Sequence, residues 1–154
     1  MDVFEKMKEE HRIIIKTIVG LIGSDPTTRR NLMNDLIIQI LAHMNAEEQS
    51  IYKALEALDA VPRSLAIRYY EEHHVAKVLM NELQDRGIDN EFWAAKLQVF
   101  RSILERHMES EEKTIFDMAL DYFSEDEILK IATEYEHMEA DLFNKGRIEP
   151  IFRE

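Results

Sequence analysis

Two histidine–glutamate pairs have the spacing of metal ligands on a helix. Glu47 follows His43 by four residues, and Glu111 follows His107 at the same distance. Residues four apart project from one face of a helix, with their Cβ atoms about 5 to 6 Å apart. In both segments that face is otherwise apolar, so the imidazole and the carboxylate would point into a core. Neutral imidazole and carboxylate suit iron, manganese or zinc.

Both pairs belong to an internal repeat. The segment HMNAEEQSIY, which begins at His43, recurs as HMESEEKTIF from His107, and the segment EEH that ends at His11 recurs as the EEH that ends at His73. The repeat divides the chain into matching halves, about 9–58 and 71–120. His11 and His73 also lie on apolar stripes, which places four imidazoles and two carboxylates in one core. The candidate metal ligands are His11, His43, Glu47, His73, His107 and Glu111.

Two buried carboxylates that face each other need a positive charge between them. A buried carboxylate without partners is unstable or stays protonated, and two such groups repel each other. Two bridging carboxylates with two histidines on each metal would make a dinuclear site whose symmetry mirrors the repeat. The ring nitrogens that do not bind metal need acceptors, for which Glu10, Glu72 and main-chain carbonyls are candidates.

Two further histidines allow a competing scheme. Glu71 with His74, and Glu134 with His137, match the ExxH spacing of ferritin-like carboxylate proteins. That scheme would leave the two histidine–glutamate pairs buried without a purpose, at a cost in free energy. We therefore expect His74 and His137 to lie on polar or solvated faces.

Tyr70 lies one turn before His73 on the same predicted face. Its phenol could pack in the core with the hydroxyl bonded to a partner. Alternatively, the hydroxyl could bond or ligate at an open coordination position of a metal. The sequence leaves both interpretations open.

Long helices must position these side chains. The chain has only 4 Gly and 3 Pro in 154 residues, too few for a turn-rich β fold. Apolar residues recur at intervals of three and four, as in amphipathic helices. Turn and capping residues predict helices over 3–22, 27–58, 63–86, 91–121 and 125–144. Short connections make neighbours antiparallel, so we expect one all-α domain over 1–154: an up-down-up-down four-helix bundle with an additional C-terminal helix.

His11 and His43 lie at different distances from the turn that connects their two helices. Counted from the turn at Gly23 to Asp25, His43 lies further along its helix than His11 does along the preceding one. The two imidazoles can meet only if the second helix overhangs that turn or has an offset first turn. We expect one of these two arrangements.

Charge and composition exclude several classes of function. Lys and Arg number 19 and Asp and Glu 31, a net charge of −12 that repels nucleic acid and anionic membranes. With no Cys, the chain has no disulfides, iron–sulfur clusters or thiol catalysis. Its first residues are charged, and nowhere do about 18 uncharged apolar residues follow one another. We expect a cytoplasmic protein with neither nucleic acid nor a membrane as partner.

The order of the motifs resembles the hemerythrin family, specifically its HHE cation-binding branch. The resemblance covers most of the chain and implies a left-handed four-helix bundle with a non-haem di-iron centre and an oxo or hydroxo bridge. Carried over to this sequence, it implies two iron ions, with manganese or zinc also possible. The terminal ligands would be His11, His43, His73 and His107, and the bridging carboxylates Glu47 and Glu111.

The chain departs from the oxygen-carrying hemerythrins in two places. Those proteins have a further His one turn after the third-helix ligand, where this chain has Lys77, and their last carboxylate is an Asp one residue later than Glu111. Each iron would therefore be more open to small ligands, which weighs against reversible oxygen carriage.

The expected function follows from that openness. We expect a monomer or homodimer that binds or reduces dioxygen, nitric oxide or peroxide for sensing, storage or detoxification; whether it is an enzyme stays open. Alternatives are iron handling, including iron–sulfur cluster repair, and an interaction module that a metal staples together.

Overall fold

The computed structural model describes residues 2–85 and 87–144, and every regular element among them is helical. The elements are α1 (Val3–Leu21), α2 (Pro26–Glu47), η1 (Glu48–Tyr52), α3 (Lys53–Glu56), α4 (Ala60–Glu82), α5 (Asn90–Ser110), η2 (Glu111–Ile115), α6 (Phe116–Tyr122) and α7 (Glu125–Asn144). The all-helical prediction is therefore confirmed for these residues. The predicted domain extends to residue 154, but residues 145–154 lie outside the described residues.

Capping residues start α2 and α7 within one residue of the predicted positions. Asp25 accepts a hydrogen bond from the Thr28 backbone at 2.8 Å, directly before Pro26 at the first helical position. Ser124 and Glu127 accept from each other's backbone N–H, which makes the predicted capping box at the start of α7.

The predicted 63–86 helix begins three residues earlier, at Ala60. It also ends earlier, because the backbone turns after Glu82 with hydrogen bonds between residues three apart.

Two of the predicted helices contain a π-helical turn that the sequence analysis did not foresee. The 27–58 segment consists of α2, η1 and α3 in direct succession, and the 91–121 segment consists of α5, η2 and α6. In a π turn the backbone N–H bonds to the carbonyl five residues back, and such turns are frequent at functional sites. Here η1 begins directly after Glu47, and η2 begins at Glu111.

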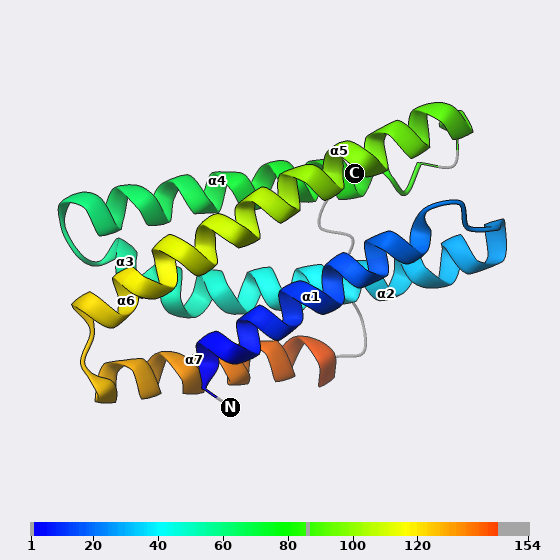
Figure 1. The fold of residues 1–154 in the computed structure, drawn as a ribbon. Helices are drawn as coiled ribbons and strands as arrows, with labels where there is room; N and C mark the ends of the chain where they lie inside the picture. The colour runs from blue at the N-terminus through cyan, green and yellow to red at the C-terminus, as the bar shows by residue number, and fades with distance from the viewer. Residues whose placement is uncertain (1, 86, 145–154) are drawn as a thin grey trace.

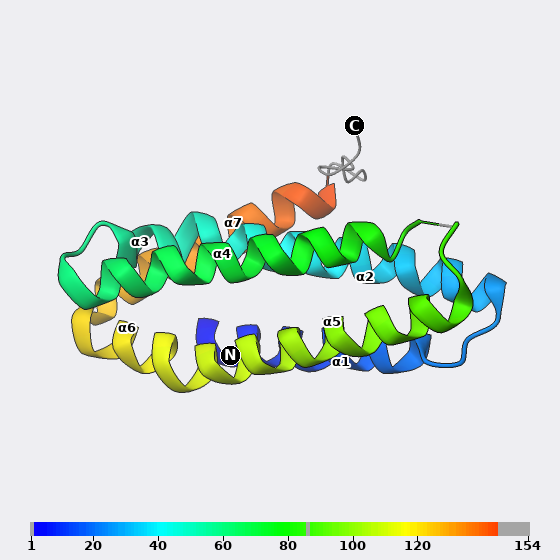
Figure 2. The same ribbon diagram turned by 90° about the horizontal axis from the view of Figure 1, so that it is seen from above.

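The long helices pack side by side in two layers. In Figure 2, α1 and α5 form one layer and α2 and α4 the other. α1 contacts α2 and α5, and α4 contacts α5. α7 lies against α2, on the outside of these four segments (Figure 1). No described helix combines the length and apolar composition that crossing a membrane would need.

The start of α2 extends beyond the end of α1, as the heights of His11 and His43 required (Figures 1 and 2). Between the two helices the chain turns at Gly23, whose φ of 69° lies in the left-handed region that glycine adopts without strain. The overhang allows the His11 and His43 rings to meet, with their centroids 4.8 Å apart.

Apolar side chains form two buried clusters, one on each side of the predicted metal ligands along the bundle. The first cluster includes Ile14, Ile18, Leu36, Ile40, Met80, Leu97, Phe100 and Leu104. The second includes Phe4, Met7, Ile51, Tyr52, Tyr69, Ile115, Phe116, Ile131 and Tyr135. α1, α2 and α4 contribute residues to both clusters, whereas α5 contributes to the first cluster and η2 and α6 to the second. The two clusters therefore shield the polar layer from water along the bundle axis.

Candidate metal centre

All six residues singled out by the sequence lie together in the interior. His11 comes from α1, His43 and Glu47 from α2, His73 from α4, His107 from α5 and Glu111 from the start of η2. The two carboxylate side chains are completely buried, and each histidine is at most 5% exposed. Their potential ligand atoms form two overlapping groups within 4.8 Å: one joins His11 and His43 to both glutamates, and the other joins His73 and His107 to the same glutamates.

Each carboxylate lies between one histidine of the first group and one histidine of the second group. Glu47 Oε1 is 3.2 Å from His43 Nε2 and 3.3 Å from His73 Nε2. Glu111 Oε1 is 3.0 Å from His11 Nε2, and its Oε2 is 3.5 Å from His107 Nε2. The two glutamates are therefore common to both groups of potential ligand atoms.

Several polar atoms of the centre have no hydrogen-bond partner among the described residues. They are Nε2 of His11, Nε2 of His43, both carboxylate oxygens of Glu47, and Oε1 of Glu111. Leaving one buried polar atom unsatisfied costs about 1 to 3 kcal/mol, so five in one place need a compensating partner. Cations held between the imidazoles and the carboxylates would supply it, and this donor set is one that iron, manganese and zinc accept. The residues present therefore fit a metal centre.

The charges of the centre lead to the same conclusion. Burial lowers the pKa of the His11 imidazole, but the nearby Glu111 and Glu47 carboxylates together outweigh burial and raise the pKa to about 9. The pKa of His107 rises to about 10 in the same way, through Glu111 and Glu72. Burial raises the pKa of Glu47, yet the charge of His43 and the contacts with Glu111 and His11 together outweigh burial and hold that pKa well below its usual value. The centre therefore attracts positive charge, whether as protons or as metal ions.

Outside the centre, four carboxylates hold the other nitrogen of each imidazole. Nδ1 of His43 lies 2.9 Å from Glu10, and Nδ1 of His107 lies 2.7 Å from Glu72. These are the two acceptors that the sequence suggested. The other two acceptors were not predicted: Glu48 lies 2.8 Å from Nδ1 of His73, and Glu112 lies 2.7 Å from Nδ1 of His11. A signal for them was present, because both halves of the repeat read Glu-Glu at these positions.

The four outer contacts form a closed ring around the bundle, which we call the carboxylate ring. α1 supplies Glu10 to the histidine of α2, and η1 supplies Glu48 to the histidine of α4. α4 supplies Glu72 to the histidine of α5, and η2 supplies Glu112 to the histidine of α1. An Nδ1–H that donates to a carboxylate leaves the Nε2 lone pair directed at the inside of the centre. The ring thus fixes all four imidazoles in the orientation that metal binding requires.

Two tyrosines that the sequence analysis did not assign reach the centre. The Tyr52 hydroxyl, at the end of η1, donates to Glu111 and lies 3.2 Å from Nε2 of His73 and 3.4 Å from Nε2 of His107. The Tyr135 hydroxyl, on α7, donates to Glu10 and lies 2.9 Å from Nδ1 of His43. Tyr52 therefore faces the ligand atoms themselves, and Tyr135 faces the carboxylate ring.

The sequence leaves two roles open for Tyr70, packing in the core and ligation of a metal, and the contacts of its hydroxyl fit packing. Its hydroxyl donates to the Glu48 backbone carbonyl at 3.1 Å and to the Glu56 carboxylate at 3.3 Å. Neither partner is one of the six candidate ligands, so these contacts favour packing over the alternative in which Tyr70 ligates a metal. Lys77, which replaces the further His of oxygen carriers, pairs with Glu48 at 3.1 Å and supports the ring from outside.

The ferritin-like scheme is also wrong. His74 and Glu71 are exposed on α4, and His137 is exposed on α7. These side chains therefore belong to the surface, as we expected for the two histidines.

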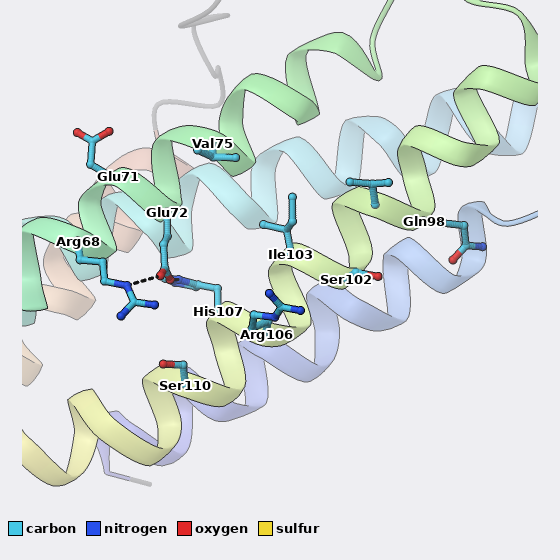
Figure 3. A pocket seen from close by; sticks show the side chains of 11 residues that line it. Arg68, Glu71, Glu72, Val75, Gln98, Ser102, Ile103, Arg106, His107 and Ser110 are labelled. Atoms are coloured by element: carbon cyan, nitrogen blue, oxygen red, sulfur yellow. Dashed lines mark hydrogen bonds and ion pairs between the residues drawn. The ribbon is translucent and has the colours of Figure 1, made fainter.

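Surface grooves lie on both sides of α5, next to the centre. The larger, about 670 Å³, lies between α4 and α5, where Arg68 and Glu72 meet His107 (Figure 3). The smaller, about 440 Å³, lies between α1 and α5 and is lined by His11 and Glu112. Each groove thus ends at a histidine of the centre and its outer carboxylate.

Comparison with known proteins identifies one family. The family model described as hemerythrin HHE cation binding domain matches residues 2–119, which include all six residues of the centre but not α7. Neither the curated proteins nor the solved structures gave a match.

Proposed function

The chain belongs to the hemerythrin HHE cation-binding family, and from that premise we propose that its centre holds two iron ions and binds or reduces a small ligand such as dioxygen, nitric oxide or peroxide. The proposal includes the up-down-up-down arrangement of the four repeat helices that is typical of this family. It extends to a role in sensing, storage or detoxification.

One observation supports the dinuclear site above all: both groups of potential ligand atoms contain the same two glutamates. His11 and His43 would hold one ion, and His73 and His107 the other. Glu47 and Glu111 would be shared between them. Bound iron would supply redox chemistry and open coordination positions for small ligands.

The residues of the chain have three tasks in this proposal. The carboxylate ring orients the imidazoles, as its four Nδ1 contacts indicate. The two apolar clusters keep bulk water away, which strengthens electrostatic interactions inside the centre. The grooves beside α5 give a small molecule a path toward His107 and His11.

Iron handling is the second candidate, and the solvent exposure of two side chains of the carboxylate ring favours it. The side chains of Glu72 and Glu112, at the two grooves, are 27% and 31% exposed, whereas those of Glu10 and Glu48 are 19% exposed. Carboxylates that touch both solvent and a ligand histidine could pass a metal ion outward. In that case the metal itself would be the cargo.

Metal analysis together with optical spectra of anaerobically purified protein tests the proposal. We expect two irons per chain and an absorption spectrum that changes on addition of dioxygen or nitric oxide. Loss of iron to a weak chelator or to an apo iron–sulfur protein, without a spectral response to these gases, would favour iron handling. Failure to bind iron at all would contradict both candidates.

A further inference from the structure

The two halves of the repeat differ at one buried position beside the centre. In the aligned segments HMNAEEQSIY and HMESEEKTIF, the last residues are Tyr52 and Phe116. Tyr52 closes the π turn η1, and Phe116 directly follows η2. Both side chains are buried, at 0% and 3% exposure. The repeat therefore provides the centre with a phenol from one half and a plain benzene ring from the other.

The Tyr52 oxygen lies among the donor atoms of one metal position. Its three polar contacts are Nε2 of His73, Nε2 of His107 and Oε2 of Glu111. The ring is held in place by His73, with centroids 5.0 Å apart, and by Tyr70 at 5.5 Å. A fixed oxygen that close to two imidazole nitrogens and a carboxylate occupies a place where a further ligand of the same ion would be.

At the opposite position, formed by His11 and His43, no described tyrosine places its oxygen among the inner nitrogens. The Phe116 ring stacks near His11, with centroids 6.3 Å apart, and packs against Phe4 at 5.0 Å. The distribution of unsatisfied atoms shows the same asymmetry. Nε2 of His11 and of His43 have no hydrogen-bond partner among the described residues, whereas Nε2 of His73 and of His107 face the Tyr52 hydroxyl.

We infer that the Tyr52 oxygen is a ligand of the metal position formed by His73 and His107, and that the position formed by His11 and His43 is the one left open to a small ligand. The inference rests on the proposed function. Ligation exchanges the O–H bond of Tyr52 for a bond from the same oxygen to the cation, and the proton leaves to solvent. No electron is transferred in this step.

The test compares the wild type with two variants after loading with iron and oxidation to iron(III). Phenolate bound to iron(III) gives a visible charge-transfer band and tyrosinate modes in the resonance Raman spectrum. We expect both signals in the wild type and in the control Tyr70→Phe, which removes a hydroxyl from the same aromatic group without touching the ligands. Tyr52→Phe should lose both signals while it still binds two irons per chain.

The exchange in the opposite half provides a second readout. Phe116→Tyr places a phenol on the side of His11 and His43, so it should close the open position and weaken nitric oxide binding by at least about tenfold. If Tyr52→Phe does not fold, nitric oxide binding by Phe116→Tyr tests the inference on its own. Tyrosinate signals that persist in Tyr52→Phe, or nitric oxide binding that is unchanged in Phe116→Tyr, would overturn the inference while leaving the iron centre intact. Absence of iron from the wild type would instead overturn the proposed function and, with it, this assignment.

Discussion

Tyr135 on α7 donates a hydrogen bond to Glu10 on α1, and this contact connects the helix outside the repeat to the carboxylate that holds His43. The hydroxyl also lies 2.9 Å from Nδ1 of His43. α7 is therefore part of the surroundings of the centre, although the family match ends before it. The other three members of the carboxylate ring receive no such contact from α7 within the described part of the chain.

Removing this hydroxyl should weaken metal binding. We expect Tyr135→Phe to lower the affinity for iron by about tenfold, since changes to groups that orient a ligand histidine cost about 10- to 100-fold. Competition with a chelator measures the effect. Tyr122→Phe is the matched control, because that side chain is exposed on α6. If Tyr135→Phe binds iron as tightly as the wild type, the Tyr135 hydroxyl has no role in metal binding and the side chain serves only in packing.

The shared carboxylates should determine stoichiometry. Replacing either Glu47 or Glu111 with Ala removes a donor from both metal positions, so each variant should contain fewer than two irons per chain. Glu109→Ala changes an exposed carboxylate that pairs with Lys113 at 2.6 Å, and this variant should keep two irons per chain. Metal analysis of the three purified proteins decides; full occupancy in both Glu47→Ala and Glu111→Ala would contradict the ligand assignment.

Glu139 should make stability depend on pH. Burial, together with the nearby Glu10 carboxylate, raises the pKa of Glu139 to about 7 even though Lys6 lies 3.1 Å away. The unfolded chain loses this proton near its ordinary pKa of 4.5, whereas the folded chain keeps it up to about 7. This group therefore lowers the free energy of unfolding as the pH rises through that interval, with no further change above it.

Denaturant unfolding of wild type and Glu139→Gln at about pH 5 and about pH 8 measures this contribution. The variant should gain stability relative to the wild type at the higher pH. Glu136→Gln, at an exposed position on α7, serves as the control. An identical pH dependence in wild type and Glu139→Gln would contradict the raised pKa.

A cavity in the first apolar cluster should destabilise the fold. Leu36 is completely buried there, so Leu36→Ala should cost about 2 to 5 kcal/mol of unfolding free energy. Ile38→Ala, two residues away on the same helix and 39% exposed, should cost much less. Urea titration compares the two variants, and equal losses would show that the packing of α2 is not as described.

The sequence was sufficient to predict the histidines and inner glutamates because they obey α-helical spacing. His43 and Glu47 both lie within α2, so the rule that residues four apart share a face applies to them without change. His107 precedes Glu111 within the last turn before η2, where the rule still applies. Capping residues fixed most helix starts for a similarly local reason.

Tyr52 was not predicted because α-helical spacing does not apply across the π turn in which it lies. In an α-helix, residues five apart point in different directions, so Tyr52 would not share the face of Glu47. The π turn η1 is wider and alters this register, which brings Tyr52 toward the ligands of α4 and α5. Tyr70 was considered instead, since α-helical spacing from His73 favoured it. Glu48 and Glu112 were missed for another reason: their partners lie on neighbouring helices, which local spacing does not specify.

The carboxylate ring has a consequence for how such a chain can be divided. Glu48 from the first half holds His73 of the second, and Glu112 from the second half holds His11 of the first. A separate hairpin made of either half would therefore lack one of its two outer acceptors. Two copies of a single hairpin, related by a twofold axis, would restore both, because each copy would give its carboxylate to the other. In this respect the chain is built as a fused homodimer, in which one covalent connection replaces the association of two subunits.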